Sequence, residues 1–186
     1  SVLLKSQEIN PDSRDCHVVA HFVAIAAVEK NPREWRQFLS SVDANLCGGG
    51  FIHGAVEGLN RYDSSFTFDA KTLYQMCDIA KKSVNEGEVS DNVCGHYIGH
   101  ILLVEANANI EPAVEACKEV PLAVQNSCYA GVFMENILRV NLSAHGLGGR
   151  LPVNEQTVRD YEKVCQEQDG LTSQNCWLEM PHVYGD

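Results

Sequence analysis

Apolar residues recur at intervals of three and four along most of this chain, and that spacing predicts α-helices. The alternation of β-branched and polar residues that is typical of half-buried strands is almost absent. Polar, glycine or proline breaks divide the pattern into nine predicted helices, at residues 15–30, 33–42, 51–59, 69–84, 92–106, 111–119, 123–140, 154–166 and 173–180. Residues 141–152 contain three glycines and Pro152, so we predict a long loop there. The expected fold is therefore all-α, with eight or nine helices.

Glycines in two of the predicted helical segments follow helical spacing. Gly50, Gly54 and Gly58 are four residues apart, as are Gly95 and Gly99. Glycine inside a helix costs about 1 kcal/mol relative to alanine, so such a stripe needs a compensating role. A face of small residues lets another helix backbone approach closely, and we expect tight helix pairs at these positions.

Two parts of the chain resemble each other. Residues 16–21 and 94–100 both begin with cysteine and carry two histidines, and residues 51–57 and 129–135 both run from an aromatic residue to a glutamate. The likeness favours about four degenerate helical-hairpin repeats. The length suits a single domain, residues 1–186, built as a disulfide-stapled bundle or as a closed array of helix-loop-helix repeats.

The chain has eight cysteines, and their placement predicts disulfides. In three cases one cysteine lies at the end of a predicted helix and another lies at the start of the next helix. The remaining two cysteines are paired by elimination. The predicted bonds are Cys16–Cys47, Cys77–Cys94, Cys117–Cys128 and Cys165–Cys176. The alternative is a set of buried thiols in a cytosolic protein.

Disulfides indicate an oxidising compartment, extracellular or periplasmic. The triplet Asn141-Leu142-Ser143 fits the N-glycosylation pattern, which also favours export. The first residues lack signal-peptide anatomy, so we expect an exported form to have lost its signal already.

Five of the seven histidines lie in pairs of metal-ligand residue types spaced four apart. Residues i and i+4 share one face of a helix, so each pair can coordinate one ion or line one pocket. The pairs are His17 with His21, His53 with Glu57, and His96 with His100. We predict that these five histidines, from several helices, form a transition-metal site with one or two ions.

Imidazole suits copper, iron and zinc, and the identity of the ion stays open among them. Glu57 and Glu135 are the candidate catalytic residues, as ligands or as general acid and base beside a metal-bound water. We expect a secreted metal-dependent enzyme acting on a small molecule; a redox reaction is slightly favoured over zinc-type hydrolysis.

Two alternatives have no catalytic role. Imidazoles and glutamates could hydrogen-bond one another in the core of a disulfide-stabilised helical-repeat module that binds a partner or serves as structure. Clustered histidines could also make the protein responsive to pH near 6.

Charge and hydropathy exclude other classes. The net charge is −11 without a basic stripe, which argues against nucleic-acid binding. No apolar run approaches the roughly 18 residues of a membrane span, so we expect no membrane insertion. The oligomeric state is not predicted.

Overall fold

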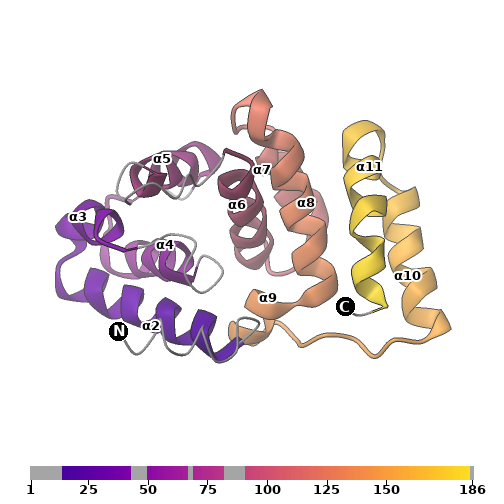
Figure 1. The fold of residues 1–186 in the computed structure, drawn as a ribbon, viewed down its shortest axis with the longest axis horizontal. Coiled ribbons are helices and arrows are strands. Elements are labelled where there is room, and N and C mark those ends of the chain that lie inside the picture. Colours follow the sequence, from indigo (N-terminus) through magenta and orange to yellow (C-terminus); the bar gives the residue numbers. More distant parts are fainter. Residues whose placement is uncertain (1–13, 43–49, 67–68, 82–90, 185–186) are drawn as a thin grey trace. The chain divides into compact units, whose positions relative to one another are not determined.

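The computed structural model describes residues 14–42, 50–66, 69–81 and 91–184. Within these ranges the protein is all-helical, as predicted, with ten α-helices and two 3₁₀ turns (Figure 1). The helices are α2 Arg14–Lys30, η1 Pro32–Glu34, α3 Trp35–Ser40, α4 Gly50–Tyr62, α5 Ala70–Lys81, α6 Asp91–Glu105, α7 Ile110–Cys117, α8 Leu122–Leu138, α9 Val140–Ala144, α10 Glu155–Gln166, α11 Gly170–Glu179 and η2 Met180–Val183.

The short helix α9 corrects the prediction of a continuous loop at residues 141–152. Arg139 adopts the left-handed conformation, with φ of 54°, and ends α8. The backbone N–H of Leu142, in the first turn of α9, then donates to the buried Glu135 carboxylate. The sequence pattern missed α9 because its N-terminus is stabilised by a side chain of the preceding helix. The remainder of the segment lacks helix up to residue 154, and Arg139 holds it through the carbonyls of Leu147 and Gly148.

The chain divides into two compact units, residues 1–90 and residues 91–186. Unit 1 contains α2 to α5, and unit 2 contains α6 to η2. A single domain over residues 1–186 and the use of about four repeats stay predictions.

In unit 1, α2 packs against α4 with both helices running in the same direction. Gly54 faces the carbonyl of His21. One turn later on α4, Gly58 faces Ile25 and Val28, which lie one to two turns later on α2. A Cβ on Gly54 would collide with the His21 carbonyl oxygen, so only glycine permits this approach. Every residue from Gly50 to Leu59 is buried.

In unit 2, α6 packs against α8 in the same parallel sense (Figure 1). Gly95 faces Val124 and Ser127, and Gly99 faces the Cys128 carbonyl. Gly131 in turn lies on the carbonyl of His96. The glycine spacing seen in the sequence therefore does mark close helix contacts.

Helix α11 packs on α8, again in parallel. Helices α7 and α10, called the returning helices below, connect the parallel helices: α7 precedes α8, and α10 precedes α11. The Asn175 amide of α11 donates to Asn126 Oδ1 of α8 over 2.6 Å. Helix α10 begins at Asn154, whose side chain caps the Thr157 N–H at 2.9 Å, as its Asn-to-helix sequence pattern favours.

Two disulfides tie the returning helices of unit 2 to the helices that follow them. Cys117 at the end of α7 is bonded to Cys128 of α8, and Cys165 of α10 is bonded to Cys176 of α11. These are two of the pairs that the sequence suggests. Cys16 and Cys94 are also disulfide-bonded. Their expected partners, Cys47 and the side chain of Cys77, lie outside the described part of the chain.

No helix in the described ranges combines the length and the apolar character needed to cross a bilayer.

We predict that Gly131→Ala destabilises the protein by about 1–3 kcal/mol, because the added Cβ meets a backbone oxygen that cannot move without separating α6 from α8. This loss should appear although alanine favours helix more than glycine does. Urea unfolding at pH 7 measures it. Gly149→Ala is the matched control, since its Cβ would meet only the Ser143 hydroxyl at 3.9 Å. Equal stability of the two variants would contradict the tight packing.

Candidate functional site

The candidate site in unit 1 brings together His21 from α2 and two residues of α4, His53 and Glu57. The His21 and His53 rings lie edge to face with centroids 4.7 Å apart, and a ring nitrogen of each lies within 4.8 Å of the other. His21 Nε2 is 2.9 Å from Glu57 Oε2. All three side chains are buried. Helical spacing places His53 and Glu57 on one face of α4, and the Gly54 contact brings that face to His21.

Arg61 completes this group from one turn further along α4. Its guanidinium forms an ion pair with Glu57 Oε1, while Glu57 Oε2 faces His21. Burial, and then the charge of Arg61, lower the pKa of His21 from 6.5 to about 4. His21 is therefore neutral at physiological pH, which is the form of imidazole that binds a metal.

In unit 2 the corresponding region pairs His100 of α6 with Glu135 of α8. His100 Nδ1 is 2.7 Å from Glu135 Oε2. The same oxygen accepts a hydrogen bond from the Asn141 amide over 2.8 Å, and Glu135 Oε1 accepts one from the Leu142 N–H, also over 2.8 Å. Glu135 is fully buried, so these donors replace the water that its carboxylate has lost.

Because a carboxylate accepts hydrogen bonds, the contact with Glu135 assigns the proton of a neutral His100 ring to Nδ1. The Nε2 lone pair is then the one left for a metal or a substrate proton. Carboxylate–histidine pairs of this kind orient metal ligands in proteins. Glu135 is thus placed to position His100.

His96 lies one turn before His100 on α6, with ring centroids 4.7 Å apart. Its Nε2 is 3.3 Å from the Sδ atom of Met134. Burial is the main cause that lowers the pKa of His96, from 6.5 to about 3, and the nearby His100 and His182 lower it further.

A carboxylate from α11 approaches the same region. Glu179 Oε2 is 3.3 Å from His182 Nε2. Burial raises the pKa of Glu179, while His182 and then His100 oppose that rise. Arg150 donates to the His182 carbonyl over 2.5 Å and fixes the C-terminal turn.

The predicted ligands therefore meet within each unit, His21 with His53 and His96 with His100, each pair beside a buried glutamate. The side chain of His17 lies outside the described residues. A common site for all five histidines stays a prediction, because it concerns both units.

Three contributors were not singled out from the sequence. Arg61 follows Glu57 by four residues, and that helical spacing could have indicated the ion pair. Met134 had no such signal, and Asn141 was noted only as part of the glycosylation triplet. Their contacts here depend on the packing of α8 against α6 and on the turn into α9.

Asn141 also corrects the interpretation of the glycosylation triplet. Its side chain is buried and its amide donates to Glu135. Because this nitrogen is buried and points at Glu135, the folded protein does not present Asn141 as an acceptor.

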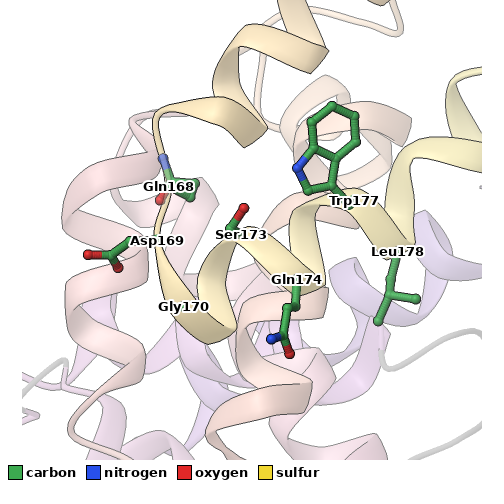
Figure 2. A pocket seen from close by; sticks show the side chains of 7 residues that line it. All are labelled: Gln168, Asp169, Gly170, Ser173, Gln174, Trp177 and Leu178. Carbon is green, nitrogen blue, oxygen red and sulfur yellow. The ribbon is translucent and has the colours of Figure 1, made fainter.

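An open groove lies around the first turns of α11, and no histidine lines it (Figure 2). It is lined by Gln168, Asp169, Gly170, Ser173, Gln174, Trp177 and Leu178. Asp169 is the one ionisable residue of that lining, so the groove has no cluster of metal-ligand or acid–base groups.

We predict that Glu135→Gln destabilises the protein by about 1–3 kcal/mol, because glutamine sets an amide N–H₂ against the Leu142 N–H or against the Asn141 and His100 donors. Urea unfolding at pH 7 measures the change. Glu155→Gln, on the exposed start of α10, removes only a surface ion pair with Arg159 and should change stability by less than about 0.5 kcal/mol.

We predict that stability falls as the pH drops from 6.5, because the unfolded chain protonates His96 near its ordinary pKa and the folded chain does so only near 3. At pH 5 this one residue should account for about 2 kcal/mol. The charged groups that act on His96 are His100, on the same helix, and His182. Glu135 in turn contacts His100, and Glu179 contacts His182.

The measurement is urea unfolding of metal-free wild type and His96→Gln between pH 4 and 8. The variant should lose less stability on acidification than wild type does. Parallel curves would show that His96 titrates normally in the folded state.

Comparison with known proteins adds no assignment: no family model, no curated protein and no solved structure matches this chain. The function therefore has to follow from the chemistry of the residues that the fold brings together.

Proposed function

We propose that this is a transition-metal-binding protein of an oxidising compartment, with a mononuclear centre in unit 1 held by His21, His53 and Glu57. The observation that carries the proposal is that His21 of α2 meets both the His53 ring and the Glu57 carboxylate of α4, and that all three side chains are buried. Two imidazoles and one carboxylate form a common catalytic ligand set in proteins, for iron(II) and for zinc.

The distances support a shared ion. Two donors that are each about 2.1 Å from one ion, at right angles to each other, are about 3.0 Å apart. His21 Nε2 and Glu57 Oε2 are 2.9 Å apart. The His53 nitrogen lies within 4.8 Å of the His21 nitrogen, a span that an ion and a small ring rotation can bridge.

Charge also supports the site. Arg61 binds Glu57 Oε1 and so turns Oε2 toward His21. Carboxylate ligands in metal sites are usually held in this way by a neighbouring donor. The disulfides of unit 2 are consistent with an exported protein, in which such a centre would form outside the cytosol.

For the reaction we propose metal-dependent chemistry on a small molecule, with oxidation by an iron or copper centre favoured over zinc-dependent hydrolysis because imidazole predominates among the candidate ligands. In this proposal Glu57 acts as ligand or as general base. In unit 2, His100, oriented by Glu135, offers a second acid–base group.

A non-catalytic role is the second candidate, and one specific observation favours it. Both oxygens of Glu57 already have protein partners, His21 and Arg61. Such a network can serve as a polar core that fixes α2 against α4 in a disulfide-stabilised helical module.

We predict that protein purified without a histidine tag binds zinc(II) or iron(II) at one site that Glu57→Gln weakens at least tenfold, since the amide is neutral and a poorer donor. Isothermal titration under anaerobic conditions measures the affinity, and elemental analysis gives the stoichiometry. Glu29→Gln changes an exposed glutamate on α2 and should bind as wild type does.

The His21→Ala/His53→Ala double variant should lose this ion altogether. Wild type that binds neither ion, with a melting temperature unchanged by either, would leave the polar-core role as the function of these residues.

A further inference from the structure

Unit 2 repeats the unit 1 contact with one donor exchanged. In unit 1, Gly54 lies on the His21 carbonyl, and the residue three positions later, Glu57, meets His21 Nε2. In unit 2, Gly131 lies on the His96 carbonyl, and the residue three positions later, Met134, meets His96 Nε2. The same helix packing therefore places a carboxylate beside histidine in one unit and a thioether in the other.

This exchange changes the kind of ion that the position favours. Carboxylate oxygen is a hard donor, whereas thioether sulfur is soft and selects copper(I) among the biological metals. We propose that His96 and Met134, joined by His100, form a second metal site in unit 2 that selects a soft monovalent ion of the copper(I) class.

The geometry of the two atoms fits one ion. Donors about 2.0 Å and 2.3 Å from a metal, at an angle near 100°, are about 3.3 Å apart. His96 Nε2 and Met134 Sδ are 3.3 Å apart. Without the ion the same distance suits a weak N–H···S hydrogen bond, and moving the proton to Nδ1 frees the Nε2 lone pair with no net proton release.

His100 supplies the third donor. Its ring contacts that of His96, and the hydrogen bond from Nδ1 to Glu135 leaves Nε2 as the basic nitrogen. Both histidines and Met134 are only partly exposed, so the site is shielded but not sealed from solvent. Two imidazoles and one thioether form a neutral, soft, three-coordinate set.

Cysteine does not compete for a soft ion in the described part of the chain. Every cysteine described there is in a disulfide. The methionine sulfur is thus the soft donor that unit 2 places beside a histidine nitrogen, while Met180 packs near Phe133 and Ile137 in an apolar setting.

Silver(I) is the probe, because it mimics copper(I) and needs no reductant that would open the disulfides. The full chain, untagged and in chloride-free buffer, is labelled with ¹³C at its three methionine methyl groups and titrated with silver nitrate. We expect one equivalent of silver(I) to shift the Met134 signal and to leave those of Met76 and Met180 in place. An unmoved Met134 signal overturns the proposal.

Met134→Leu keeps the side-chain volume and removes the sulfur, and it should weaken silver(I) binding at least tenfold. Met180→Leu is the matched control and should bind as wild type does. Competition with a coloured copper(I) chelator under ascorbate should give the same order for copper(I). Equal affinity of the two variants for silver(I) overturns the proposal.

The unit 2 site does not depend on the proposed centre in unit 1, and the two can fail separately. Zinc(II) or iron(II) binding lost in His21→Ala/His53→Ala, with silver(I) binding kept, would assign the two ions to the two units. Silver(I) binding lost in that double variant and kept in Met134→Leu would overturn the unit 2 site alone.

Discussion

The close approach of parallel helices at glycine is the constraint on which both candidate sites depend. Gly54 and Gly131 each rest on a histidine carbonyl of the partner helix, at a distance that a Cβ would forbid. At that separation, the side chain one turn after the glycine touches the histidine on whose carbonyl the glycine rests. His21 therefore contacts Glu57 directly, and His96 contacts Met134 directly.

Burying polar groups at such a contact has a cost that the surrounding residues offset. In unit 2 the Glu135 carboxylate receives donors from His100, Asn141 and the Leu142 backbone. The same hydrogen bonds start α9 and fix the His100 ring, so local folding and ligand orientation arise from one carboxylate. In unit 1 the charge of Arg61 has the comparable role beside Glu57.

The sequence predicted the helical class, most helices and the glycine contacts, because these follow from periodicity within single segments. It also predicted which histidines share a helix face, since the four-residue spacing fixes that. It could not predict which residue of α8 meets His96: the sequence comparison aligned Glu57 with Glu135, whereas the matching helix contact falls on Met134. Register between helices depends on packing, which a one-residue offset changes without altering either pattern.

That offset decides the chemistry. If Glu135 occupied the place of Met134, both units would offer histidine beside carboxylate and would favour the same ions. With methionine there, Glu135 lies one residue further along and acts on His100 instead, so unit 2 gains a soft donor and keeps an oriented imidazole. Two helix pairs with the same packing would thus differ in the kind of metal that they favour through a single position on one face. The packing that both pairs share would remain unchanged.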